Sequence, residues 1–240
     1  MRQAIIFGAS GGIGRALTQA LIASGTYDRV WAGSRAAAAL PAALPGASPF
    51  AFSLTDEASI AAAAQTIGDH GPVHLVIIAT GILHDGALQP EKSWRALDPA
   101  AMAQVYAINT IGPALIAKHI LPLFPRAERA VFAALSARVS SIADNRLGGW
   151  HSYRASKAAL NMLIANFALE LARTRPQAIA VGLHPGTVDS PLSTPFQTAV
   201  APDKLFTPAT SAAHLLRVIE HLTPANSGQL LAWDGAQIPF

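Results

Sequence analysis

The chain has 240 residues, of which 51% are hydrophobic and 13% charged, against about 25% charged in a typical domain. This composition excludes a disordered chain, which needs low hydrophobicity and high charge. The net charge of +3 comes without any run of Lys or Arg, so a nucleic-acid-binding protein is disfavoured. The absence of Cys excludes disulfides, thiolate metal sites and cysteine nucleophiles, and we predict no metal site.

The sequence also argues against a membrane protein. Its start lacks the apolar run of about 7–15 residues that a signal peptide needs, and no segment approaches the roughly 18 apolar residues that span a bilayer. We therefore expect a soluble, cytoplasmic protein without nucleic-acid or membrane partners.

Short apolar strands alternate with helical segments along the chain. We expect strands at residues 4–7, 29–32, 50–54, 74–79, 130–135, 179–183 and 229–233, and helices at 15–24, 58–67, 100–121, 153–174 and 211–221. Residues 36–47 form a connection or a short helix, and residues 191–208, rich in Pro, Thr and Ser, form a loop. This rhythm predicts a single α/β domain over residues 1–240, with a doubly wound, Rossmann-like parallel sheet and helices on both faces.

The first expected strand runs into a glycine-rich turn and then into a helix. One glycine in such a turn allows the tight bend, another lets the backbone approach a pyrophosphate, and a third lets the helix pack against the strand. The spacing fits GxxxGxG through Gly8, Gly12 and Gly14, and equally GxxGxxG through Gly8, Gly11 and Gly14. The turn indicates a dinucleotide site, and glycines needed only for packing are the alternative.

Tyr153 and Lys157 are four residues apart in an expected helix, so their side chains lie on one face. A free Tyr has a pKa of about 10, and a cation within about 4–6 Å lowers it. The pair therefore predicts a general acid/base near neutral pH, with an accidental pair on an exposed helix as the alternative.

Together these motifs resemble the short-chain dehydrogenase/reductase family over essentially the whole chain. Gly8, Gly12 and Gly14 match its cofactor turn, and Tyr153 and Lys157 match its YxxxK motif. The segments ATGILHD, SIADNRLGGW and WDGAQIPF resemble the C-factor-like bacterial group of this family. The resemblance implies an NAD(P)-dependent oxidoreductase acting on a carbonyl or alcohol. It also implies a homodimer or homotetramer that pairs residues 100–121 and 153–174.

The resemblance implies roles for many further residues. Asn109 is expected to be the structural and proton-relay Asn, Val188 to touch the nicotinamide, and Ser190 to replace the Thr that binds its carboxamide. Two positions depart from the family pattern, because Ile78-Ala79-Thr80-Gly81 stands in place of NNAG and Ser53 in place of an Asp. The implied cofactor site comprises Gly8, Ser10, Gly12, Ile13, Gly14, Ser34, Arg35, Leu54, Ala79, Gly81, Tyr153, Lys157, Pro185, Gly186, Val188 and Ser190.

The catalytic Ser is less well defined, because the family's usual Ser-Ser pair is Ser136-Ala137 here. We favour Ser136, which ends the expected fifth strand. Ser140, thirteen residues before Tyr153, is the next candidate and Ser141 the third. A Ser that only caps a turn is the alternative for each of them.

The end of the second strand indicates which cofactor binds. A carboxylate there favours NAD, and an Arg accommodates the 2′-phosphate of NADP. Ser34-Arg35 stands there, so we predict NADPH.

We predict a reductase that transfers hydride to a hydrophobic ketone or aldehyde, with Tyr153 as the general acid. The expected substrate pocket contains Leu83, Arg138, Trp150, His151 and Leu192, with residues 191–208 as a closing loop. A non-catalytic cofactor-binding or signalling protein on the same fold is the alternative.

Overall fold

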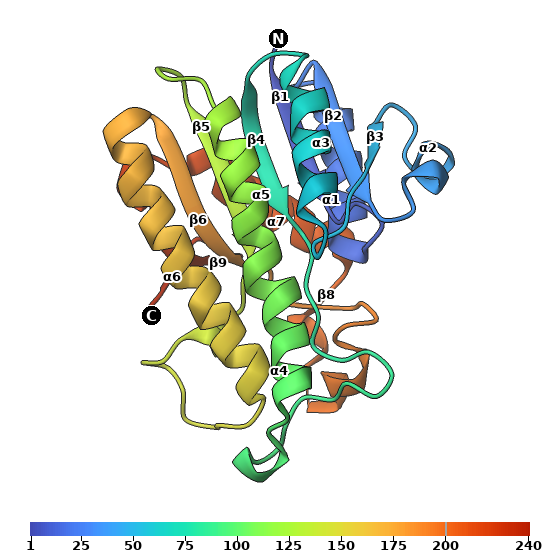
Figure 1. Ribbon diagram of the computed structural model, residues 1–240. Helices are drawn as coiled ribbons and strands as arrows, with labels where there is room; N and C mark the ends of the chain where they lie inside the picture. Colours follow the sequence, from blue (N-terminus) through green and yellow to red (C-terminus); the bar gives the residue numbers. More distant parts are fainter. Residues whose placement is uncertain (200) are drawn as a thin grey trace.

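The computed structural model describes residues 1–199 and 201–240, and eight of its strands form one twisted sheet between two layers of helices (Figure 1). The strand order is β10-β9-β6-β5-β4-β1-β2-β3, and every neighbouring pair is parallel except β9 and β10. Two further strands, β7 and β8, form a small separate parallel pair. The strands are β1 Gln3–Phe7, β2 Arg29–Ser34, β3 Ser48–Ala51, β4 Val73–Ile78, β5 Ala130–Leu135, β6 Ala178–His184, β7 Thr187–Val188, β8 Leu205–Phe206, β9 Leu230–Ala232 and β10 Gln237–Ile238.

Helices cover both faces of the sheet. The core beneath α3, α5 and α6 lies on one face, and the core beneath α1 and α7 lies on the other. The α-helices are α1 Gly12–Ser24, α2 Leu40–Ala43, α3 Glu57–Gly68, α4 Pro99–Tyr106, α5 Gly112–Ile120, α6 His151–Thr174 and α7 Pro208–His221. Short 3-10 turns occur at Ala37–Ala39, Trp94–Ala96, Leu121–Leu123, Arg138–Ser140, Thr194–Ala199, Pro202–Lys204 and Pro224–Asn226. The predicted doubly wound α/β architecture is confirmed.

The prediction differs from the structure in its short elements. The third strand covers Ser48–Ala51, so Leu54 follows the strand instead of ending it. The two-residue strands β7, β8 and β10 were not predicted, because periodicity needs a longer window. The expected loop at residues 191–208 contains 3-10 turns and β8, and Val200 within it lies outside the described residues.

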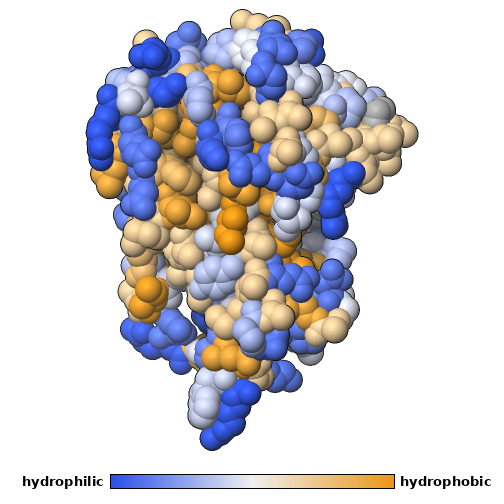
Figure 2. All heavy atoms as spheres, in the orientation of Figure 1, coloured by the Kyte–Doolittle hydropathy of each residue, from blue (hydrophilic) through white to orange (hydrophobic). Residues whose placement is uncertain are grey.

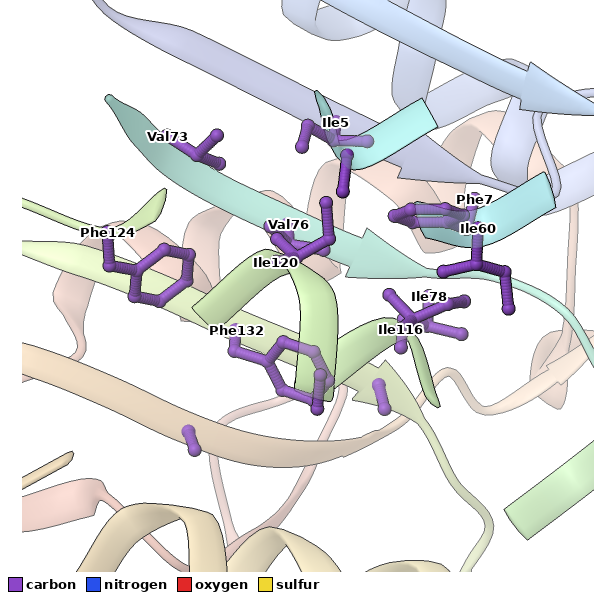
Figure 3. Close-up of a cluster of buried hydrophobic side chains, with 14 of the residues drawn as sticks. Ile5, Phe7, Ile60, Val73, Val76, Ile78, Ile116, Ile120, Phe124 and Phe132 are labelled. Atoms are coloured by element: carbon purple, nitrogen blue, oxygen red, sulfur yellow. The ribbon is translucent and has the colours of Figure 1, made fainter. Parts of the chain in front are cut away.

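The central strands are apolar runs because both of their faces are covered. Every residue of β1, β4 and β5 is buried. Figure 3 shows Val76 and Ile78 of β4 beside Ile116 and Ile120 of α5 in one of the two core clusters. Because the parallel strands all end at the same edge, the loops that follow them gather there.

A continuous helical stretch combines α4, a five-residue π-helix at Ala107–Ile111 and α5. Pro99–Leu123 is long and apolar enough to cross a membrane by length and composition, contrary to the expectation that no such segment exists. Within the fold, however, the stretch buries Val105, Ile116 and Ile120, as the core helix of a soluble protein does. A cytoplasmic location stays a prediction from the sequence.

Candidate active site

The glycine turn joins β1 to the N-terminus of α1. Gly8 has φ +93°, and a Cβ placed on Gly14 would lie 2.2 Å from the carbonyl oxygen of Gly8. Both positions therefore require glycine for steric reasons. A Cβ on Gly11 or Gly12 would meet nothing closer than 3.5 Å and 3.4 Å respectively, so packing does not choose between the two spacings.

A cavity of about 660 Å³ opens beside this turn, along the carboxyl ends of β1, β2, β3 and β4. Seven of the cofactor residues expected from the sequence line it: Gly8, Ser10, Ser34, Arg35, Leu54, Ala79 and Gly81. The Ser34 hydroxyl donates to the Ser10 hydroxyl at 3.1 Å, which ties the end of β2 to the glycine turn. Arg35 is exposed beside it, and none of the ion pairs within residues 1–199 and 201–240 uses its guanidinium.

The other residues of this cavity wall were not among the expected cofactor residues, although Gly11, Ser53 and Thr80 were noted in the sequence. They lie in the loops that follow β1, β3 and β4, or in α4 and the first residues of the π-helix. They are Gly11, Phe52, Ser53, Thr55, Thr80, Ile82, His84, Asp85, Gln104, Ala107 and Ile108.

The remaining expected cofactor residues lie beyond this cavity wall. Ile13 and Gly14 are in the first turn of α1, and the Cβ of Ser190 is 4.0 Å from the Cβ position of Gly12. Gly186 has φ +78° and packs against Phe206 and Trp233, between Pro185 and the buried Val188. The segment after β6 thus faces the glycine turn at Gly12.

Tyr153 and Lys157 lie in the first and second turns of a long helix, α6, which packs against β6. Lys157 is 3% exposed, and its Nζ donates to the carbonyl oxygen of Leu135 at 2.7 Å. Burial lowers the pKa of Lys157 to about 8. Burial raises the pKa of Tyr153 to about 12, opposite to the lowering that the sequence analysis expected from Lys157.

The lysine amine lies next to the cavity wall. A Cβ on Gly81 would lie 3.5 Å from both Lys157 Nζ and Asn109 Oδ1. Lys157 and Asn109 therefore lie directly behind Gly81, which is one of the residues that line the cavity.

Asn109 is fully buried in the π-helix, a local widening that often marks functional sites. Its Oδ1 accepts from the Ile82 amide at 2.9 Å, and its Nδ2 donates to the Ile82 carbonyl at 2.9 Å and to the Ser156 hydroxyl at 3.1 Å. The side chain therefore ties the loop after β4 to α6, next to Lys157.

Two of the candidate serines, Ser136 and Ser140, form a buried network with Asn161 of α6. Ser136 donates to Asn161 Oδ1 at 2.7 Å, and Asn161 Nδ2 donates to the Ser140 hydroxyl at 2.8 Å. Ser140 in turn donates to the Ala137 carbonyl at 2.6 Å, and Ser141 accepts from the Asp144 amide at 3.0 Å. All three serines are buried, so geometry leaves their order of preference as the sequence set it.

Among the expected substrate residues, Trp150 lies beside Tyr153, Leu83 follows β4 and Leu192 follows β7. The Trp150 ring meets the Tyr153 ring edge-on at 6.3 Å and the Phe196 ring at 4.8 Å. Leu83 is buried, and Leu192 is 36% exposed in the loop that holds Phe196. His84 joins the two sides, because its Nε2 lies 3.1 Å from the Pro191 carbonyl and 3.2 Å from the Leu192 carbonyl.

The other two expected substrate residues lie elsewhere. Arg138 is half-exposed and forms an ion pair with Asp144 at 2.9 Å, so its charge is already matched. His151 lines a separate cavity of about 370 Å³, with Ala155 and Ala158. The helical period explains this, because residues 151, 155 and 158 share the face of α6 opposite Tyr153 and Lys157.

Comparison with known proteins is consistent with this geometry. Residues 2–201 match the family described as short chain dehydrogenase. The chain belongs to this family. It is an NAD(P)-dependent oxidoreductase that acts on a carbonyl or alcohol group.

Two curated relatives indicate the group within the family to which this short-chain dehydrogenase is similar. It is 34% identical to the C-signal of Myxococcus xanthus over 174 residues, which are 71% of this chain and 94% of that protein. It is 29% identical to 1-hydroxy-2-glutathionyl-2-methyl-3-butene dehydrogenase of a Rhodococcus species over 242 residues, 98% of each chain. The resemblance to the C-factor-like group is thereby confirmed.

Solved structures share the whole fold of this dehydrogenase. NADPH-bound carbonyl reductase from chicken fatty liver superposes with a TM-score of 0.85 at 27% identity, covering 100% of both chains. The carbonyl reductase Sniffer of D. melanogaster superposes with a TM-score of 0.87 at 21% identity, also over 100% of both chains, and supports the fold alone.

Proposed function

We propose that this protein is an NADPH-dependent reductase that transfers hydride to a hydrophobic ketone or aldehyde, with Tyr153 as the general acid. The position of Lys157 carries the proposal. Its amine is fixed by the end of β5 and lies 3.5 Å from the Cβ position of Gly81, in the wall of the cavity that starts at the glycine turn. Proton-transfer chemistry and a dinucleotide cradle thus meet at one place.

The cavity fits a dinucleotide in size and in lining. It measures about 660 Å³, and its turn leaves no room for a Cβ on Gly8 or Gly14. Ser34 and the exposed Arg35 at the end of β2 supply a hydroxyl and a guanidinium where NAD-dependent enzymes place a carboxylate. The NADPH-bound carbonyl reductase is a neighbour above 25% identity, which supports the same cofactor.

Bound NADPH supplies the hydride. Tyr153 donates its phenolic proton to the carbonyl oxygen of the substrate, and its raised pKa keeps that proton in place at neutral pH. Among the described residues Lys157 donates only to Leu135, and its other N–H donors would bind the ribose next to the nicotinamide. Asn109 holds the loop after β4 against α6. Ser136 polarises the carbonyl oxygen once its hydroxyl proton turns from Asn161 toward the substrate.

Aromatic and aliphatic side chains support a hydrophobic substrate. Trp150 lies between Tyr153 and Phe196, and Leu83 and Leu192 add apolar surface nearby. Residues 191–208 act as the substrate loop, and His84 holds this loop through two of its carbonyl oxygens. The whole chain, residues 1–240, works as one dinucleotide-binding and catalytic domain.

The outer face of α5 and α6 supports assembly into a homodimer or homotetramer. Figure 2 shows apolar side chains gathered over these helices. Ile111, Met162 and Leu169 are each more than half exposed, and a groove of about 500 Å³ runs between Ala114 and Phe167. Exposed apolar surface of this kind is typical of contacts between subunits.

The test is a pair of binding titrations with NADPH and NADH, followed by a screen of aromatic and aliphatic aldehydes and ketones. Energy transfer from the four Trp residues to the nicotinamide reports binding. Tight NADPH binding, weaker NADH binding and turnover of apolar carbonyl compounds are expected. Binding without turnover of any carbonyl would favour the non-catalytic alternative, which the relative named C-signal and the engaged Ser136 hydroxyl support.

A further inference from the structure

A carboxylate from a distant loop lies at the start of the catalytic helix. Glu91 belongs to the segment between β4 and α4, yet it is only 7% exposed. Its Oε2 accepts from the Ser152 amide at 3.1 Å, its Oε1 accepts from the Ser152 hydroxyl, and its main-chain carbonyl accepts from the Trp150 amide at 2.5 Å. Three hydrogen bonds therefore join this one residue to the two residues around His151.

The N-terminus of helix α6 has no side-chain cap from its own capping residue. The first amides of a helix lack partners within it, and Ser, Thr, Asp or Asn usually supplies a side-chain cap. The capping position here is Trp150, whose indole cannot accept a hydrogen bond, and the first turn of α6 holds no acidic residue. Glu91 supplies the hydrogen-bond acceptor that the first amides of the helix need. Its negative charge also stabilises the helix N-terminus.

The ionisation of Glu91 fits this role. Burial opposes the charged form, but the hydrogen bonds from Ser152 and from the Glu91 backbone, together with the nearby His151, hold the pKa of the carboxyl below its ordinary value. The carboxylate is therefore charged at neutral pH.

Glu91 also holds an unfavourable backbone conformation. Trp150 has φ +51°, in the left-handed region of backbone conformation. Among residues 1–199 and 201–240 it is the only non-glycine residue with a positive φ. A bulky side chain adopts this conformation only when its surroundings enforce it. The hydrogen bond from its amide to Glu91 does so, and the indole then stands between Tyr153 and Phe196.

We propose that Glu91 is a positioning residue, which sets the place of Tyr153 and of the Trp150 ring by capping α6 from outside the helix. This inference rests on the proposed reductase function. It predicts that loss of the carboxylate impairs proton transfer and leaves NADPH binding intact, because Glu91 does not line the cofactor cavity.

The first test compares Glu91→Gln and Glu91→Ala with a matched control, Asp98→Ala. Asp98 caps α4 by accepting from the Ala101 amide at 2.8 Å, so its loss also removes a carboxylate cap, but from another helix. Each alanine variant is expected to lower Tm by about 2–4 °C. Only the Glu91 variants are expected to lower kcat, by about 10- to 100-fold, with the NADPH dissociation constant unchanged. A kcat for Glu91→Ala equal to that of Asp98→Ala would overturn the proposal.

The second test needs no substrate, so it separates this proposal from the proposed function. The ultraviolet absorbance of tyrosinate is titrated with and without Tyr153→Phe, which isolates the phenol of Tyr153. Its pKa of about 12 results from burial, so a loosened α6 start in Glu91→Ala is expected to lower the midpoint toward 10. If the wild-type protein reduces no carbonyl compound, the proposed function fails and this titration alone decides the role of Glu91. An unchanged midpoint then overturns it.

Discussion

The buried amine of Lys157 donates a hydrogen bond to the carbonyl oxygen of Leu135, 2.7 Å away at the end of β5. The partner is a neutral carbonyl, and none of the ion pairs among residues 1–199 and 201–240 includes Lys157. The lysine is thus fixed in position while its charge stays uncompensated, and burial lowers its pKa to about 8. A bound cofactor enters a site whose central cation is already in place.

Removal of the Tyr153 hydroxyl is expected to stop the chemistry without emptying the cofactor site. Tyr153→Phe should lower kcat for carbonyl reduction by about 10²- to 10⁴-fold, because the proton donor is lost. NADPH affinity should stay within about twofold, since the ring and its packing against Trp150 remain. Steady-state kinetics and the binding titration measure both quantities, with Tyr27→Phe as the control. Full activity of Tyr153→Phe would refute the assignment.

The buried serines can be separated by single substitutions. Ser136→Ala is expected to lower kcat by about 100-fold, because the hydroxyl that polarises the substrate oxygen is removed. Ser141→Ala is expected to retain activity, since its hydroxyl accepts from the Asp144 amide in a surface turn. Rates of carbonyl reduction at saturating NADPH provide the measurement. The reverse pattern would move the catalytic role to Ser141.

Arg35 is expected to determine the choice between the two cofactors. Arg35→Ala should weaken NADPH binding by about 10- to 100-fold, the loss of one or two charge-assisted hydrogen bonds, and leave NADH binding nearly unchanged. The energy-transfer titration gives both dissociation constants, and Arg95→Ala serves as an exposed arginine control. Equal losses for the two cofactors would show that Arg35 does not contact a 2′-phosphate.

The depressed pKa of Lys157 predicts how stability depends on pH. Between about pH 8 and 10.5 the unfolded chain holds this proton and the cofactor-free folded protein does not. The free energy of unfolding therefore rises with pH across this interval, by at most about 1.4 kcal/mol per pH unit. Above pH 10 the raised pKa of Tyr153 acts in the opposite sense, because the unfolded chain then loses its phenolic proton first.

Urea unfolding between pH 7 and 10 checks this prediction. The wild-type protein should gain stability from about pH 8 upward, and Lys157→Met should remove that part of the rise. An identical pH profile in the two proteins would mean that the Lys157 amine is not desolvated.

The glycine turn allows a stability test with a matched pair. Gly14→Ala forces a Cβ to within 2.2 Å of the Gly8 carbonyl oxygen, and backbone atoms cannot move aside easily. We expect a loss of about 3 kcal/mol and a Tm lower by roughly 6–12 °C. Gly11→Ala meets nothing closer than 3.5 Å and should change Tm little. Thermal unfolding of both variants without cofactor measures the difference, and similar Tm values would contradict the steric argument.

Long periodic segments and glycine spacing carried most of the correct predictions. The buried runs of β4 and β5 and the helix that holds Tyr153 and Lys157 follow from local patterns. Seven of the expected cofactor residues line one cavity beside the glycine turn, because strand ends in a parallel sheet meet at one edge. The raised pKa of Tyr153 was not predicted, since its cause is burial, which depends on what packs around the ring.

The sequence by itself determined the order of strands and helices, the glycine turn and the spacing of Tyr153 and Lys157, because these depend on residues close together in the chain. Only the tertiary structure decided that Arg138 pairs with Asp144 and that Glu91 caps α6. The cap joins residues about sixty positions apart, and no local periodicity encodes such a contact. It exists because the loop after β4 and the start of α6 are brought together at one edge of a folded sheet.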